Sequence, residues 1–202
     1  MADSHPSPQD LFDSDWSPPD PPRWDGTVVQ VLHVHPDILS LTRVAFLPTA
    51  RHGLECGLFW YGTSQGTNST VHAIVVPEQI NSWGHYELPE HAVDALSEAT
   101  RPRGWFNLSQ VHTHPSKWVG HSDYDNRYAN SRQALSLVFP SYGRVHPRWP
   151  DDIGVHEFLE GRWQRLSDEK VPLRIVFDSK LPTPEILDLR PRNVLYTYPR
   201  KG

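Results

Sequence analysis

The sequence predicts an α+β protein with a mixed, mostly antiparallel sheet flanked by helices. Apolar or alternating segments of strand length recur along the chain, and one longer segment has its alanines and leucines at helical spacing. The order of these segments mixes hairpins with helices, which is typical of the α+β class. With 202 residues, of which 37% are hydrophobic, the chain can bury one core. We therefore expect a single folded domain.

The expected elements follow one another along the chain. Residues 27–34 are an apolar run that ends before a proline, so they form the first strand, and Asp37 then caps a helix over residues 38–46. Residues 88–99 form an amphipathic helix, and residues 122–133 form a short one. The other apolar segments end near Gly, Pro or turn residues and are expected to be strands: residues 54–62, 69–77, 105–114, 134–140, 153–161, 162–166 and 172–177.

The two ends of the chain differ from its body. Residues 1–25 contain six Asp, one Arg and six of the 20 prolines, so they account for the whole formal net charge of −5. Such an acidic, proline-rich segment buries too little apolar surface to fold, and we expect a disordered tail. The folded domain then covers residues 26–180, and residues 181–202 form an extended C-terminal tail that lies across the domain or binds a partner.

Composition excludes several classes of partner and chemistry. The chain beyond the acidic tail carries 18 basic and 18 acidic residues, and a neutral body offers no basic face for nucleic acid. No apolar run approaches the ~20 residues of a membrane-spanning helix, and the first residues have neither the basic start nor the apolar core of a signal peptide, so we expect a cytoplasmic protein without a membrane partner. The lone Cys56 excludes an intramolecular disulfide and a cysteine metal cluster, and it is expected to be a small core residue.

The segment HTHPSKWVGHSDYD, residues 112–125, concentrates groups that bind metals. His112 and His114 end a predicted strand and lie two residues apart, so their side chains point the same way. Ser122 begins the predicted short helix, and Asp125 lies one turn into it. The loop of seven residues between His114 and Ser122 can fold the helix start over the strand end. Two imidazoles and one carboxylate, with a fourth position open, are typical of a catalytic zinc site.

A second His-x-His-Pro segment, residues 33–36, provides an internal comparison. Eight residues after His35 the chain has Arg43, and eleven residues after it Phe46, where the other segment has serine and aspartate. Neither Arg43 nor Phe46 can complete a metal site, so only the segment 112–125 is expected to bind metal.

The spacing His-x-His, seven residues, Ser, two residues, Asp resembles the motif of the JAMM (JAB/MPN+) zinc metalloisopeptidases. That family also has a glutamate on an upstream strand, followed by small and apolar residues, and ECGLFWYG, residues 55–62, is similar to it. The resemblance covers roughly residues 27–160. It implies the JAB/MPN fold of that family, which is cytidine-deaminase-like with α/β/α-like layers, for the domain of residues 26–180.

The resemblance assigns a role to each matching residue. His112, His114 and Asp125 would hold Zn²⁺ as the cofactor, with water as the fourth ligand. Glu55 would be the general base that moves the proton, and Ser122 would donate a hydrogen bond to the oxyanion of the tetrahedral intermediate. Bound zinc lowers the pKa of its water towards ~7, which provides a nucleophile at neutral pH. The implied class is a zinc metalloprotease.

The resemblance also implies a class of substrate. JAMM relatives mostly cut after the C-terminal tail of ubiquitin or a ubiquitin-like protein, and Thr113 between the two histidines favours this isopeptidase branch. Only residues 126–133 separate the site from the next strand, which is similar to compact bacterial stand-alone JAB proteins. The expected partners are a ubiquitin-like protein or its conjugate, and conjugation-system proteins. The substrate tail would add a strand to a sheet edge, covered by Trp118 and Val119.

Two alternatives stay open beside the deubiquitinase-like isopeptidase. A processing peptidase that trims a small carrier protein would apply the same chemistry to a different substrate. A non-catalytic MPN scaffold would normally have lost one or more of the site residues, and this chain has all five of them. The retained residues therefore favour an enzyme.

Overall fold

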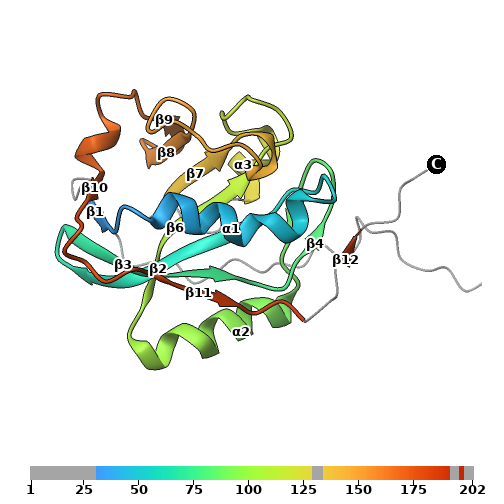
Figure 1. The fold of residues 1–202 in the computed structure, drawn as a ribbon, viewed down its shortest axis with the longest axis horizontal. Coiled ribbons are helices and arrows are strands. Elements are labelled where there is room, and N and C mark those ends of the chain that lie inside the picture. Colours follow the sequence, from blue (N-terminus) through green and yellow to red (C-terminus); the bar gives the residue numbers. More distant parts are fainter. Residues whose placement is uncertain (1–30, 129–133, 192–195, 198–202) are drawn as a thin grey trace, which may run out of the picture.

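The computed structural model describes residues 31–128, 134–191 and 196–197, and its centre is a large mixed sheet (Figure 1). This sheet has nine strands in the order β10-β1-β3-β2-β6-β7-β8-β9, with β11 paired to β3, and a three-stranded sheet has the order β12-β4-β5. The strands are β1 Val31–Val34, β2 Gly57–Gln65, β3 Asn68–Val76, β4 Ile80–Asn81, β5 Tyr86–Glu87, β6 Phe106–Thr113, β7 Leu135–Phe139, β8 Gly154–Leu159, β9 Arg162–Arg165, β10 Ile175–Phe177, β11 Glu185–Asp188 and β12 Tyr196–Thr197.

Two helices cover opposite faces of the larger sheet. On one face, Trp60 of β2 donates from Nε1 to Thr42 Oγ1 of α1 at 3.0 Å. On the other face, Phe59 of β2 belongs to the apolar cluster that contains Leu96 of α2. Neighbouring residues of a strand point to opposite faces, so the two clusters are separate layers of the core. The helical segments are α1 Ile38–Ala50, α2 Glu90–Thr100, α3 Asp123–Tyr128 and the short 3₁₀ turns η1 Arg101–Arg103, η2 Ser141–Gly143 and η3 Val171–Leu173.

Helix α1 begins where the sequence predicts and ends later. Its first residue is Ile38, and it continues past Phe46 and through Pro48 to Ala50. Phe46 and Ala50 are buried, so packing against the sheet holds the last turn despite the proline. Asp37 occupies the N-cap position, but its side chain makes no capping hydrogen bond, so this detail of the prediction is wrong.

The α+β class is confirmed, and the balance of strand directions differs from the prediction. The pairs β2–β3, β2–β6, β4–β5, β7–β8 and β8–β9 are antiparallel. The pairs β1–β10, β1–β3, β11–β3, β12–β4 and β6–β7 are parallel. The sheets are therefore mixed, as expected, but less antiparallel than expected. Parallel neighbours need a crossover connection, and the crossover between β6 and β7 is the segment that contains the candidate site.

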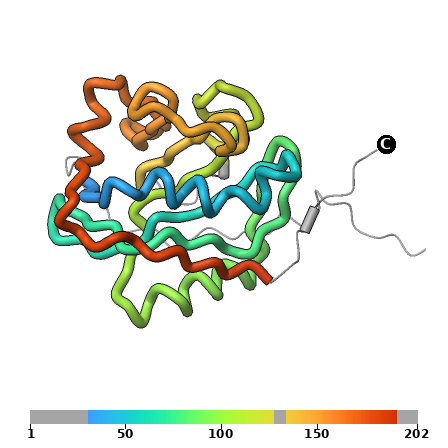
Figure 2. The backbone as a smooth tube through the Cα atoms, in the orientation of Figure 1, coloured from blue at the N-terminus to red at the C-terminus, as the bar shows by residue number. Residues whose placement is uncertain are grey.

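The chain beyond residue 181 rejoins the sheet. Strand β11 pairs in parallel with the second half of β3, and the Leu189 N–H donates to the Val76 carbonyl at 2.8 Å. Figure 2 shows this red segment running along the edge of the sheet. It covers the part of β3 that β1 leaves unpaired. The predicted disordered tail, residues 1–25, lies outside the described residues.

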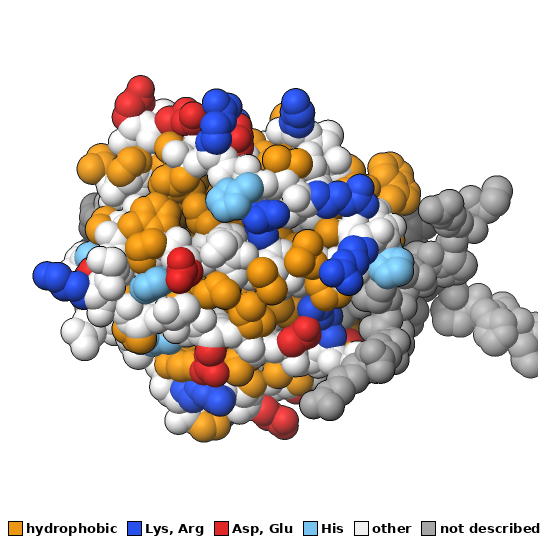
Figure 3. Space-filling model, viewed as in Figure 1, with side chains coloured by type: hydrophobic (Ala, Val, Ile, Leu, Met, Phe, Trp, Pro, Cys, Tyr) orange, Lys and Arg blue, Asp and Glu red, His pale blue; other side chains and the backbone are white. Residues whose placement is uncertain are grey.

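The surface agrees with the balanced charge of the body. On the face drawn in Figure 3, basic and acidic side chains are interspersed with hydrophobic ones, and neither sign gathers into a single patch. None of the helices in the described part of the chain is long and apolar enough to span a membrane.

Candidate metal centre

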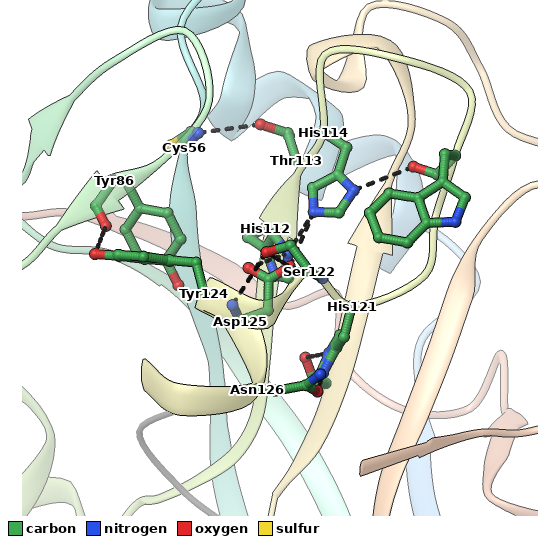
Figure 4. A network of polar contacts seen from close by, with 12 residues as sticks. Cys56, Tyr86, His112, Thr113, His114, His121, Ser122, Tyr124, Asp125 and Asn126 are labelled. Carbon is green, nitrogen blue, oxygen red and sulfur yellow. Dashed lines mark hydrogen bonds and ion pairs between the residues drawn. The ribbon is translucent and has the colours of Figure 1, made fainter.

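The end of β6 and the start of α3 bring the candidate ligands together (Figure 4). His112 lies in β6, and His114 follows the strand directly. β6 is paired on both sides, with β2 and with β7, so the strand end is fixed within the sheet. Helix α3 begins at Asp123, directly after Ser122, as the Ser-x-x-Asp pattern predicts. The first turn of this helix holds Asp125 over the two histidines.

Three ligand atoms converge at this point. Nε2 of His112 and Nε2 of His114 lie 3.2 Å apart, and each lies 3.2 Å from an oxygen of Asp125. Ligand atoms bound about 2.0 to 2.1 Å from a tetrahedral zinc lie roughly 3.3 Å from one another, so this spacing fits a zinc-sized ion. Within the described residues, these side chains are the one group of at least three His, Cys, Asp or Glu residues that could hold a metal.

The hydrogen bonds of His114 determine which of its nitrogens is free. Nδ1 lies 3.1 Å from the carbonyl oxygen of Trp118, which can only accept, so Nδ1 carries the proton. In a neutral imidazole Nε2 then has a lone pair, and this lone pair faces a carboxylate oxygen of Asp125 at 3.2 Å. The two electron-rich atoms repel each other unless a proton or a metal cation lies between them. A hydrogen bond to the outer nitrogen is also what orients a metal-binding histidine.

Asp125 is held as a carboxylate ion. Burial by itself raises the pKa of Asp125, but the contacts with His112 and His114 and the Ser122 backbone N–H hold this pKa well below its usual range. The N–H and the hydroxyl of Ser122 both donate to Asp125 Oδ2 at 2.7 Å, and the hydroxyl oxygen accepts from the Asp125 N–H at 3.1 Å. The single hydroxyl proton of Ser122 is thus directed at the ligand. Donation from Ser122 to an oxyanion stays a prediction.

Glu55 lies at the entrance to β2, outside the group of three ligands. Gly57 of β2 stands opposite His112 of β6, so Glu55 emerges at the same end of the sheet as the histidines. The Glu55 N–H donates to the Ser82 carbonyl at 2.8 Å, and the Glu55 carbonyl accepts from Asn81 Nδ2 at 2.7 Å. The residue is 4% exposed; burial, with a further contribution from the Asp125 charge, raises the pKa of Glu55 to about 8. Such a carboxyl exchanges protons near neutral pH.

The loop between the ligands packs closely against β8. Val119 is buried, and a Cβ at Gly154 would lie 1.9 Å from the Val119 carbonyl oxygen, so only glycine permits this approach. The Trp118 ring stacks on His114 with centroids 5.2 Å apart, yet 55% of the residue is exposed. Trp118 therefore covers one side of a ligand and presents its remaining surface to solvent.

Several residues that hold the site have no signal in the sequence. Gln79 accepts from the Gly57 N–H at 2.8 Å and donates to the Gly57 carbonyl at 2.9 Å. The Tyr142 N–H donates to the His114 carbonyl at 2.7 Å, and its hydroxyl donates to the Trp83 carbonyl at 2.9 Å. Each acts on a backbone group far away in the chain, so no local spacing indicates it.

A stacked pair of histidines, His121 and His156, lies next to the ligand His112, whose ring centroid is 6.0 Å from that of His121. The rings of His121 and His156 stack with centroids 4.0 Å apart, and Nε2 of His121 lies 2.8 Å from Ser136 Oγ. His156 is buried, and neither of its ring nitrogens has a hydrogen-bond partner among the described residues. Burial lowers the pKa of His121 to about 4 and that of His156 to about 3, so both rings are neutral at pH 7.

The second His-x-His segment (His33 and His35) and Cys56 lie outside the candidate metal centre. His33 contacts Asn68 at 3.2 Å and His35 contacts Asp37 at 3.6 Å, and neither histidine belongs to the candidate metal group. Cys56 is completely buried, and this burial raises the pKa of its thiol to about 11. It is a protonated core residue at neutral pH.

Comparisons with known proteins concern the fold and not the family. No family model and no curated protein matches the chain. Two similar solved structures are protein DSY2949 from Desulfitobacterium hafniense, with a TM-score of 0.55 and 15% identity, and a protein from Salinibacter ruber, with a TM-score of 0.51 and 21% identity. Each match covers 75% of this chain and 95% of the other. At this identity the likeness shows a shared fold alone, and the JAMM resemblance rests on the site residues.

Proposed function

We propose that this protein is a zinc-dependent peptidase or isopeptidase that hydrolyses the amide bond after the C-terminus of a ubiquitin-like protein. One observation carries the proposal: Nε2 of His112, Nε2 of His114 and the carboxylate of Asp125 converge at the spacing of zinc ligands. The substrate class comes from the resemblance of residues 55–62 and 112–125 to the JAMM motif.

The donor set favours zinc among the common divalent cations. Two imidazoles and a carboxylate suit zinc, whereas calcium and magnesium take oxygen ligands. The charge of Zn²⁺ would balance those of Asp125 and Glu55 when both are ionised, so the centre could stay partly buried without an uncompensated charge. Three protein ligands leave a fourth position for solvent or substrate, which is the difference between a catalytic and a structural zinc site.

Each residue of the centre has a separate role in the proposed amide hydrolysis. When bound, zinc supplies a water of lowered pKa and polarises the scissile carbonyl. Glu55, with its pKa raised to about 8 by burial, suits the role of accepting the proton of the attacking water and returning it to the leaving amine. Ser122 holds Asp125 in place through its N–H and its hydroxyl. The hydrogen bond to the Trp118 carbonyl leaves Nε2 of His114 facing Asp125, where this nitrogen would hold the metal.

Exposed aromatic side chains beside the centre support a peptide substrate. Trp118 is 55% exposed and stacks on His114, and Trp83 is 73% exposed. Tyr142 connects His114 to Trp83, because its N–H donates to the His114 carbonyl and its hydroxyl donates to the Trp83 carbonyl. Indole rings of this kind offer apolar surface and a polar edge to an extended chain.

The test combines metal analysis with cleavage. The full chain is loaded with zinc, dialysed and analysed for metal, and is then incubated with a ubiquitin-like protein fused through its C-terminus to a reporter. We expect one equivalent of zinc and release of the reporter, both lost with a chelator and restored by zinc. Glu55→Gln keeps the shape of the side chain and is expected to retain zinc while cleaving about a hundredfold more slowly.

Each alternative function has its own outcome in this test. Cleavage of a carrier-protein fusion, but not of the ubiquitin-like fusion, favours a processing peptidase. Zinc binding without cleavage of either fusion favours a scaffold. A chain that takes up no zinc, or a Glu55→Gln variant that cleaves at the wild-type rate, contradicts the proposed chemistry.

A further inference from the structure

Two strands near the C-terminal end of the sequence, β11 and β12, each pair with a strand of the region from β3 to β4. β11 pairs in parallel with β3, and further along β12 pairs in parallel with β4, with Tyr196 opposite Ile80 and Thr197 opposite Asn81. β4 is therefore the middle strand between β5 and β12. A two-residue pairing at a sheet edge is short, and another strand can replace it.

β4 is bonded directly to the segment that carries the proposed general base. Asn81 donates from Nδ2 to the Glu55 carbonyl at 2.7 Å. Gln79, just before β4, bonds to both the N–H and the carbonyl of Gly57, which stands opposite His112. A strand that pairs with β4 on the β12 side therefore lies next to residues 79–81. These residues are hydrogen-bonded to Glu55 and to Gly57 of β2, and β2 pairs with β6, which carries His112.

We propose that this edge of β4 is a docking site for an extended peptide strand, and that Tyr196–Thr197 of the same chain occupy it in cis. An extended substrate adds to a sheet edge through backbone hydrogen bonds, so it needs the same N–H and C=O groups of β4. The C-terminal segment is then a competitor that must leave β4 before a substrate strand pairs there. The competition rests on the proposed function, whereas docking can be measured without catalysis.

Arg190 marks where the chain can be shortened. Its guanidinium makes an ion pair with Asp188 and donates to a backbone carbonyl of α1 at 3.4 Å, which anchors the end of β11. A chain that ends at Pro191 keeps β11 and this anchor and loses the segment with β12. A matched full-length variant carries Tyr196→Pro and Thr197→Pro, because proline has no backbone N–H to offer β4.

Kinetics of the zinc-loaded proteins test the competition. The full chain, the shortened chain and the double-proline variant are compared on the ubiquitin-like fusion, after circular dichroism has shown that they fold. We expect removal of the segment to lower KM about threefold or more with kcat unchanged, because apparent affinity scales with the fraction of molecules in which the edge is free. The double-proline variant should match the shortened chain, and it alone serves if the shortened chain does not fold. Equal KM values for variant and full chain overturn the competition.

A peptide titration tests docking by itself. A fluorescein-labelled peptide of residues 192–202 is added to the shortened chain, or to the double-proline variant if only that folds. We expect a saturable rise in anisotropy, and none for the same peptide with Tyr196→Pro and Thr197→Pro. Failure of the native-sequence peptide to bind overturns the docking site. If that peptide binds while no protein cleaves the fusion, the proposed function is wrong and the docking site stands.

Discussion

Cys56 and Thr113 are joined by two hydrogen bonds that run in opposite directions between β6 and the entrance to β2. The Thr113 N–H donates to the Cys56 carbonyl at 3.1 Å, and the Cys56 N–H donates to Thr113 Oγ1 at 3.0 Å. Cys56 follows Glu55, and Thr113 lies between His112 and His114. The pair therefore ties the proposed base to the proposed ligands, and it gives the completely buried threonine a structural role.

Thr113→Val is expected to destabilise the fold around the centre. The change keeps the shape of the side chain but leaves the buried Cys56 N–H without its acceptor. Such a loss costs about 1 to 3 kcal/mol, which urea unfolding of the two proteins measures. Thr113→Ser keeps the hydroxyl and should retain more of the stability. Wild-type stability of Thr113→Val together with a loss in Thr113→Ser would mean that packing of the γ-methyl group, not the hydrogen bond, supports this junction.

Ser122→Ala is expected to weaken zinc binding about 10- to 100-fold, since it removes the hydroxyl that donates to Asp125. Competition with a chromophoric chelator measures the affinity, and Ser122→Thr serves as the control that keeps a hydroxyl. An unchanged zinc affinity together with a lowered kcat would argue against the positioning role and for donation to the oxyanion.

Glu55 should make the metal-free protein less stable as the pH rises. Burial raises its pKa from 4.5 to about 8, so the folded state holds the proton more tightly than the unfolded state. This stabilisation is fully present below about pH 4.5 and is lost as the pH rises through about 8, by an amount on the order of a few kcal/mol. Urea unfolding with a chelator present, from pH 5 to 9, should show a flatter profile for Glu55→Gln. Parallel profiles for the two proteins would contradict the assignment.

The stacked pair His121 and His156 should lower the free energy of unfolding at acid pH. Their lowered pKa values mean that the unfolded state takes up protons more readily, so stability falls as the pH drops from about 6.5 towards 4. His156→Phe keeps an aromatic ring in the stack and cannot be protonated. We expect its decline over this interval to be shallower by about 1 to 3 kcal/mol in thermal or urea unfolding. A decline as steep as in the wild type would show that other groups dominate.

Local patterns predicted the elements better than the way they pair. Helix α2 (Glu90–Thr100) and the apolar strands lie close to their expected positions, because periodicity and turn residues act within a few residues of chain. The parallel pairing of β6 with β7, and of β11 with β3, could not be predicted in this way. Pairing depends on which distant edges are free, and that is decided only when the whole sheet forms.

The sequence by itself determined the grouping of His112, His114, Ser122 and Asp125, since one strand end, one short loop and one helix start carry all four. Only the tertiary structure decided that Glu55 emerges beside them, buried and with a raised pKa, and that β12 pairs with β4. The physical reason is that the burial of Glu55 and the pairing of β12 depend on segments that are distant along the chain. The spacing of residues within one segment does not predict either of them.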